Sequence, residues 1–123
     1  MKKPNVLVAD DYREILDAVV DALRDSGVEH FVVAHNGLQA IQLIQDNLDL
    51  THVITDYNMP VTNGLEVIRQ ARILLPKATL VLMSGSFERH LREIALQSGA
   101  DYFFQKLGSE ALPAELGASS PSV

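Results

Sequence analysis

Residues 53–76 read VITDYNMPVTNGLEVIRQARILLP and contain one complete strand–loop–helix unit. The unit opens with an apolar run of strand length at residues 53–55, and Asp56 ends that run. A turn is expected at residues 58–60, because Asn and Pro favour turn conformations. The apolar residues that follow recur at helical spacing, and Pro76 ends the pattern: they are Leu65, Ile68, Ala71 and Leu75. The segment therefore predicts a buried strand followed by an amphipathic helix.

The same alternation continues in both directions along the chain. Further apolar runs of strand length lie at residues 6–9, 31–34, 80–83 and 102–104, without strict apolar–polar alternation. Such runs favour strands that are buried on both faces of a parallel sheet. Stripes of helical period separate the runs: Ile15, Leu16, Val19, Val20 and Leu23; Ala40, Ile41, Ile44 and Leu48; Leu91, Ile94, Ala95 and Ser98. We predict an α/β doubly wound five-stranded parallel sheet with flavodoxin-like order 2-1-3-4-5 and helices on both faces.

Several residues mark where the helices begin and end. Gly27 and Gly99 are expected just beyond helix ends, Asn36-Gly37 opens the second helix, and Ser86 is a candidate N-cap. A short last helix is expected after Ser109, where Pro113 is tolerated only near the first turn. The predicted domain spans residues 1–116, and residues 117–123 have the composition of a flexible tail or the start of a linker.

Composition limits the classes of function. The chain has 123 residues, enough for one domain, with 16 acidic and 10 basic residues and a net charge of -6. This balance argues against a nucleic-acid surface, and the absence of cysteine excludes disulfides and thiolate metal sites. The first apolar run is too short for a signal peptide or membrane helix, so a cytoplasmic protein without membrane contact is expected. The four histidines lack ligand spacing, so no zinc site is predicted.

Three carboxylates follow predicted strands 1 and 3. Asp10 and Asp11 follow the first strand, and Asp56 follows the third. The carboxyl ends of neighbouring parallel strands meet at one crevice, where this fold binds ligands. Like charges about 4 Å apart repel by roughly 4 kcal/mol at an effective dielectric of 20. A divalent cation with hard oxygen ligands relieves that repulsion, so the pattern predicts a site for Mg²⁺ (or Mn²⁺).

An aspartate beside such a metal can take up a phosphoryl group as a nucleophile. Lys106, after the fifth strand, can supply positive charge to the phosphoryl oxygens, and Ser84, after the fourth, can supply a hydroxyl. Each residue also has a simpler interpretation. Asp10 and Asp11 could cap the first helix, Asp56 could be a turn residue, Lys106 could be solvated, and Ser84 could bond only its local backbone.

With these residues in place, the chain resembles response-regulator receiver domains of bacterial two-component signalling from Val6 to about Lys106. The matching segments are VLVADD, ITDYNMPVTNGLEVIRQAR, VLMSGS and SGADYFFQK. The resemblance implies that Asp56 is the phospho-acceptor, and that Asp10, Asp11, Asp56 and the backbone carbonyl of Asn58 bind Mg²⁺. It also implies Lys106 as the cation that contacts the phosphoryl group, Ser84 as the switch hydroxyl and Phe103 as the switch aromatic.

The expected partners are a sensor histidine kinase or a histidine phosphotransfer domain as donor, and an output protein or domain whose activity the helix 4/strand 5 surface regulates. The expected chemistry is self-catalysed phosphorylation and dephosphorylation of one aspartate, and not enzymatic turnover. A phosphatase of the haloacid-dehalogenase type is disfavoured, because that class places a second Asp where this chain has Asn58. A third alternative is a binding module that keeps the fold and signals without phosphorylation, which needs a special reason because all the phosphorylation residues are present.

Two residues depart from the family pattern. Leu107 stands where the family usually has Pro after the conserved lysine, so a trans peptide and an altered loop are expected. Gly85 stands where Ala is commoner, and it should loosen the loop after the fourth strand.

Overall fold

The computed structural model describes residues 3–85 and 89–106, and within these ranges strands and helices alternate along the chain. The strands are β1 (Asn5–Ala9), β2 (His30–Ala34), β3 (His52–Asp56), β4 (Thr79–Ser84) and β5 (Tyr102–Gln105). The helices are α1 (Arg13–Asp25), α2 (Gly37–Asp46), α3 (Gly64–Leu74) and α4 (Arg89–Ser98).

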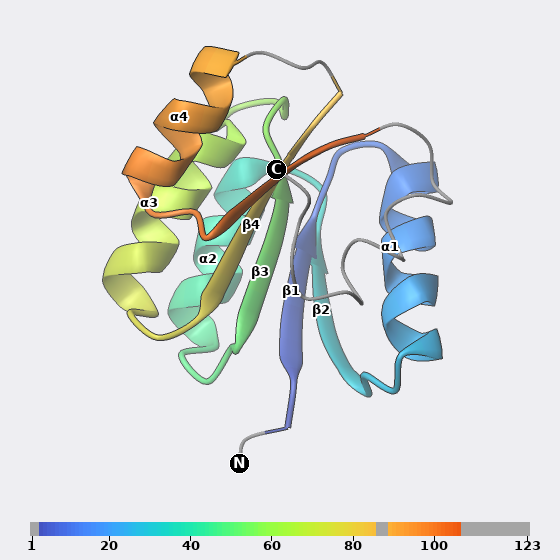
Figure 1. The fold of residues 1–123 in the computed structure, drawn as a ribbon. Coiled ribbons are helices and arrows are strands. Elements are labelled where there is room, and N and C mark those ends of the chain that lie inside the picture. Colours follow the sequence, from blue (N-terminus) through green and yellow to red (C-terminus); the bar gives the residue numbers. More distant parts are fainter. Residues whose placement is uncertain (1–2, 86–88, 107–123) are drawn as a thin grey trace.

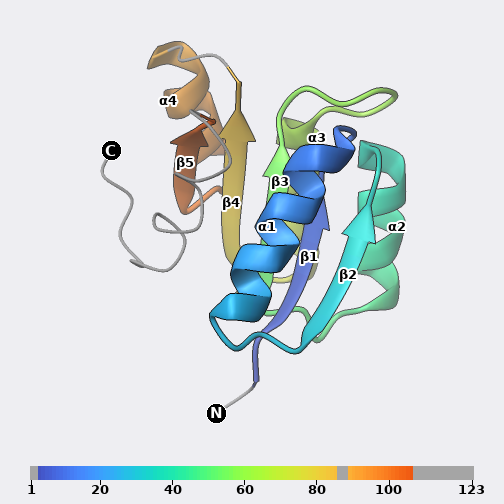
Figure 2. The same cartoon turned by 90° about the vertical axis from the view of Figure 1, so that its right-hand side faces the viewer.

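All five strands pair in parallel in the order β2-β1-β3-β4-β5, which confirms the predicted order. Figure 2 shows the strands running side by side in the same direction. In the central register, Val8 pairs with Val33 of β2 and with Ile54 of β3. The carboxyl ends of β1, β3 and β4 therefore meet at one edge of the sheet.

Two hydrophobic cores cover the two faces of the sheet. Val6 and Val8 of β1 pack into the core that α1 closes, whereas Leu7 packs into the core formed with α2, α3 and α4. Figure 1 shows α1 alone on one side of the sheet and the other three labelled helices on the opposite side. Since successive side chains of one strand enter opposite cores, the strands are buried on both faces, as their sequence predicts.

Local residues end the helices as expected at several positions. Gly27 and Gly99 have φ values of 96° and 119°, a left-handed conformation that glycine adopts without the penalty of a Cβ. The Asn36 side chain accepts a hydrogen bond of 2.8 Å from the backbone N–H of Gln39 and so caps α2. One stripe residue was wrongly placed: Leu48 lies beyond the end of α2 and is 61% exposed. Ile94 lies in α4, as the helical period predicts, and is 42% exposed.

Ser86, Leu107, the helix predicted after Ser109 and the boundary at residue 116 lie outside the described residues. In the part of the chain that the structure describes, no helix is long and apolar enough to cross a membrane.

Candidate functional site

The candidate site lies at the carboxyl ends of the strands, next to β1, which lies between β2 and β3 in the sheet (Figure 1). Asp10 follows β1 directly, Asp56 is the last residue of β3, and Ser84 is the last residue of β4. Lys106 follows β5. The topology thus delivers residues from four separate stretches of chain to one edge of the sheet, where doubly wound folds bind ligands.

The structure brings the three predicted carboxylates together. One carboxylate oxygen from each of Asp10, Asp11 and Asp56 lies within 4.8 Å of the others. Asp10 is fully buried and Asp56 is 5% exposed, whereas Asp11 faces solvent. Two of the three charges are therefore withdrawn from water, and the third stands at the mouth of the cluster.

Lys106 holds the two buried acids. Its Nζ lies 2.7 Å from Oδ2 of Asp10 and 3.0 Å from Oδ1 of Asp56, and its side chain is 14% exposed. Its backbone N–H donates to the carbonyl of Ser84 at 2.7 Å, which fixes the end of β5 against β4. The alternative of a solvated lysine at the end of a strand is wrong. One ammonium group instead serves two buried carboxylates.

The electrostatics of this cluster are not balanced. Burial raises the pKa of Asp56, the neighbouring charge of Asp10 raises it further, and the contact with Lys106 only partly opposes these effects. Burial acts to lower the pKa of Lys106, but its hydrogen bonds to Asp10 and Asp56 outweigh burial and raise that pKa. Both shifts have the same origin: an excess of negative charge in a poorly hydrated place.

Backbone contacts fix the acids in place. The N–H of Asp10 donates to the carbonyl of Ala34 at 3.1 Å, and Oδ1 of Asp10 accepts from the N–H of Tyr12 at 2.9 Å. The N-cap position of α1 is Tyr12, which makes no side-chain cap bond, so neither Asp10 nor Asp11 is the N-cap residue of that helix. Directly after β3, the N–H of Tyr57 donates to the carbonyl of Met83 at 2.7 Å. Asp56 therefore belongs to the paired strand and is more than a turn residue.

The donor set fits a hard divalent cation. Among the described residues, Asp10, Asp11 and Asp56 are the group whose ligand atoms come close enough together to hold a metal ion. Oxygen donors only, with one of them open to solvent, suit Mg²⁺ or Mn²⁺ better than a metal that prefers nitrogen or sulfur ligands. Three acids against one ammonium group also leave negative charge for a cation to offset. The residues present therefore fit the predicted metal.

The remaining predicted residues are placed as follows. Ser84 is 3% exposed at the end of β4, where its carbonyl accepts the backbone N–H of Lys106. Phe103 is 7% exposed in the core shared with α3 and α4, opposite Leu82 of β4. Asn58 lies two residues beyond Asp56, in the loop between β3 and α3. The structure fixes the positions of these residues, and their roles as switch hydroxyl, switch aromatic and carbonyl ligand stay predictions.

One contributor was not predicted from the sequence. Gly64, the first residue of α3, lies against the carbonyl oxygen of Asp56, and a Cβ at that position would stand 2.1 Å from this oxygen. The absence of a side chain lets α3 begin directly beside the acid. The Asn63-Gly64 pair just before a helical stripe was the available signal, since Asn caps helices and Gly allows close backbone approach.

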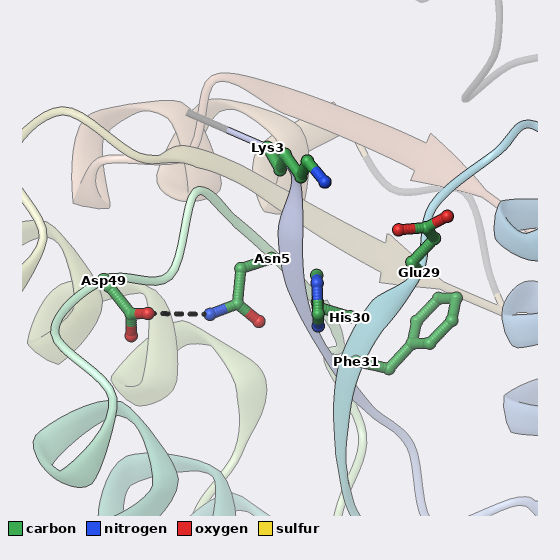
Figure 3. Close-up of a pocket in the computed structure, with 6 residues that line it drawn as sticks. All are labelled: Lys3, Asn5, Glu29, His30, Phe31 and Asp49. Atoms are coloured by element: carbon green, nitrogen blue, oxygen red, sulfur yellow. Dashed lines mark hydrogen bonds between the residues drawn. The ribbon is translucent and has the colours of Figure 1, made fainter. Parts of the chain in front are cut away.

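A surface depression at the opposite end of the sheet has a different character. Figure 3 shows the carboxylate of Asp49 accepting a 3.2 Å hydrogen bond from the side chain of Asn5. The six residues that line it are Lys3, Asn5, Glu29, His30, Phe31 and Asp49. Most of them are exposed, and their charges are mixed. This depression lacks the converging buried groups of the carboxyl-end cluster.

Comparisons with known proteins agree with the geometry. Residues 6–115 match the family described as response regulator receiver domain. The transcriptional regulatory protein CpxR of Escherichia coli is 31% identical over 101 residues, which cover 82% of this chain and 42% of CpxR. This chain thus spans less than half the length of that relative.

Two solved structures share the fold. The signal receiver domain of the response regulator NarL from Mycobacterium tuberculosis superposes with a TM-score of 0.78 at 27% identity, covering 98% of this chain and 100% of that one. The receiver domain of Ssk1 from Saccharomyces cerevisiae, solved with the histidine phosphotransfer protein Ypd1, gives 0.78 at 23% identity and covers 94% and 90%.

Proposed function

We propose that this chain, which belongs to the response regulator receiver domain family, accepts a phosphoryl group on Asp56 in a two-component phosphorelay. The observation that carries the proposal is the buried pair of Asp10 and Asp56 held by one lysine, with Asp11 at the mouth. A buried carboxylate beside an exposed acid at the mouth of the cluster, and in contact with a cation, is placed to act as a nucleophile.

The proposed reaction is an in-line displacement at phosphorus. An oxygen of Asp56 attacks the phosphorus atom, a new P–O bond forms, and the P–N bond of the donor's phosphohistidine breaks. The electron pair of that bond stays with the imidazole nitrogen, and the product is an acyl phosphate on Asp56. With acetyl phosphate as donor, acetate leaves instead. No separate general base is needed, because the attacking carboxylate is used in its ionised form.

Each neighbouring residue has a proposed task in this reaction. Asp10, Asp11, Asp56 and the Asn58 carbonyl would hold Mg²⁺, which when bound offsets charge on the phosphoryl oxygens. Lys106, already in contact with Asp56, would pair with a phosphoryl oxygen as the new charge arrives.

The proposed output is a change at the helix 4/strand 5 surface. Ser84 is the last residue of β4, and Phe103 lies on the neighbouring strand β5, where it pairs with Leu82 and is buried. We propose that the phosphoryl group draws the Ser84 hydroxyl toward it and favours the buried position of Phe103. The group acts by contacts that differ between two states of the domain, and so shifts their populations.

We further propose that the donor is a sensor histidine kinase or a histidine phosphotransfer domain, in line with the complex of Ssk1 and Ypd1. The partner that reads the signal would be an output protein or a further domain. The chain would take one phosphoryl group and release it by hydrolysis, without turnover of an external substrate.

The test is mass spectrometry after incubation with acetyl phosphate and Mg²⁺. Wild type is expected to gain one phosphoryl group in an alkali-labile bond, and Asp56→Asn is expected to gain none. The matched control is Asp49→Asn, which changes an exposed aspartate at the other end of the sheet and should label as wild type does. Equal labelling of wild type and Asp56→Asn would refute the assignment of Asp56.

A further inference from the structure

Gly37, the first residue of α2, lies against the loop that joins β3 to α3. A Cβ at position 37 would stand 1.9 Å from the carbonyl oxygen of Thr62 and 2.7 Å from its carbonyl carbon. Both are backbone atoms, so no side-chain rotation could make room. Figure 2 shows this loop reaching across the carboxyl end of the sheet toward the start of α2. Only glycine allows this approach of helix and loop.

The loop is fixed at both of its ends. The N–H of Tyr57 donates to the carbonyl of Met83 at 2.7 Å, and the N–H of Gly64 donates to the carbonyl of Tyr57 at 2.8 Å. Gly64 also lies against the carbonyl of Asp56. A displacement of Thr62 therefore cannot be absorbed by moving the loop as a rigid body. It changes the backbone conformation between the two anchors, in residues 58–63, which include Asn58.

The loop also contains a strained residue. Val61 has a φ of 73°, which is unfavourable for a β-branched side chain, and it is 81% exposed. Its own side chain makes little contact that could compensate, and the nearby turn bond runs from the N–H of Thr62 to the carbonyl of Pro60 at 2.8 Å. Strain of this kind persists only where the surrounding structure imposes it. The start of α2 is the neighbouring element packed against this part of the loop.

We propose that Gly37 is a positioning residue for the metal site: its missing side chain lets α2 hold the β3–α3 loop in the conformation that presents the Asn58 carbonyl. This inference rests on the proposed function, because it assigns Asn58 to the metal. It adds that the second helix, which contributes no ligand, sets the geometry of the site.

The test measures Mg²⁺ affinity by isothermal titration calorimetry on Gly37→Ala. The added methyl group must move the start of α2 and the Thr62 backbone apart by about 1 Å. A displacement of that size in the loop that carries Asn58 is expected to weaken Mg²⁺ binding about tenfold. The rate of phosphorylation by acetyl phosphate at subsaturating Mg²⁺ should fall by a similar factor.

The matched control is Gly27→Ala. Gly27 has a positive φ of 96° in the α1–β2 turn, at the amino end of the sheet, with no atom within 4 Å of a Cβ added there. The substitution strains the backbone and should lower the melting temperature, yet Mg²⁺ affinity should stay within about twofold of wild type. A loss of affinity that only followed lost stability would appear in both variants and would overturn the proposal.

Val61→Gly gives a second test that does not depend on the folding of Gly37→Ala. If α2 holds the loop, removing the strain at Val61 should raise the melting temperature and leave Mg²⁺ affinity within about twofold. A change of about fivefold or more would mean that Val61 itself sets the site, which overturns the proposal. Unchanged affinity in Gly37→Ala also overturns it but leaves the phosphoryl-acceptor function standing, whereas a wild type that binds no Mg²⁺ defeats both.

Discussion

The two ends of the sheet each carry a cluster of charged and polar groups, and the clusters are built on opposite principles. At the amino end, Arg72 of α3 donates to the carbonyls of Pro76, Ala78 and Gly99 and to Asp101, over distances of 2.7–3.1 Å. At the carboxyl end, one ammonium group serves two buried acids while a third acid stands close by. The first cluster is saturated, and the second has an excess of negative charge.

Because the N–H groups of the Arg72 guanidinium all have acceptors, the Arg72 cluster serves a structural role, and we call it the Arg72 clamp. Oδ2 of Asp101 accepts from Arg72 and also from the N–H of Leu80 at 2.8 Å, while the N–H of Asp101 donates to the carbonyl of Leu80 at 2.7 Å. The guanidinium group thus ties α3 to the starts of β4 and β5. Every donor has a partner, and nothing in the arrangement calls for a ligand. An unbalanced buried cluster lowers the stability of the fold unless a ligand neutralises its excess charge. This difference marks the carboxyl-end cluster as a candidate binding site and the Arg72 cluster as a structural contact.

The largest expected effect comes from removing the single cation of the carboxyl-end cluster. Lys106→Met keeps most of the side-chain volume but leaves Asp10 and Asp56 buried without their counter-charge. Removing one partner of a buried ion pair is expected to lower the free energy of unfolding by about 3 kcal/mol, measured by urea denaturation without metal. Millimolar Mg²⁺ should recover part of this loss, because a divalent cation offsets the same two charges.

Lys77→Met is the control for that measurement. Lys77 is exposed in the turn before β4, so its replacement should change stability by less than about 0.5 kcal/mol. A Lys106 variant as stable as this control would mean that the buried acids do not depend on the lysine.

The second largest effect is expected from disrupting the saturated cluster around Arg72. Arg72→Met should lower the free energy of unfolding by about 2 kcal/mol, because several buried or half-buried carbonyls lose their donor. Labelling of the folded protein by acetyl phosphate should stay within about twofold of wild type, because the clamp lies at the other end of the sheet. Arg69→Met, on the exposed face of the same helix, is the control. Reduced labelling without reduced stability would show that the clamp contributes to the site.

Much of the fold could be predicted from the sequence, because the decisive signals are local. Apolar runs without alternation indicate strands buried on both faces, and the order of strands follows from the rules for parallel crossovers. The convergence of Asp10 and Asp56 then follows, since both end neighbouring parallel strands. Periodicity alone extended the second stripe to Leu48, because it does not fix where a helix ends. Nor does it fix the width of the buried face, since Ile94 of α4 is 42% exposed.

The contacts between elements could not be predicted in this way. In the sequence, Arg72 is an ordinary polar residue on a helix, and its partner Gly99 lies 27 residues further on. The packing of Gly37 on Thr62 likewise depends on the spacing of two loops in three dimensions. Such contacts are set by tertiary geometry, and neither composition nor period carries that information.

The smallest effect is expected from removing one charge from the unbalanced carboxyl-end cluster. Asp56→Asn should raise the free energy of unfolding of the metal-free protein at pH 7 by about 1 kcal/mol, because one of two repelling buried carboxylates becomes neutral. The pKa of Asp56 lies above its ordinary value of 3.8 in the folded chain. Ionisation therefore destabilises the fold above the folded pKa, and this destabilisation disappears as the pH falls below the unfolded value. The advantage of the Asn variant should be greatest above the folded pKa of Asp56 and should disappear as the pH falls below the ordinary value of 3.8. Asp17→Asn, at an exposed position of α1, is the control variant. If Asp56→Asn is instead less stable at pH 7, the bond to Lys106 outweighs burial and repulsion, and the carboxyl-end cluster would be a saturated one like that of Arg72.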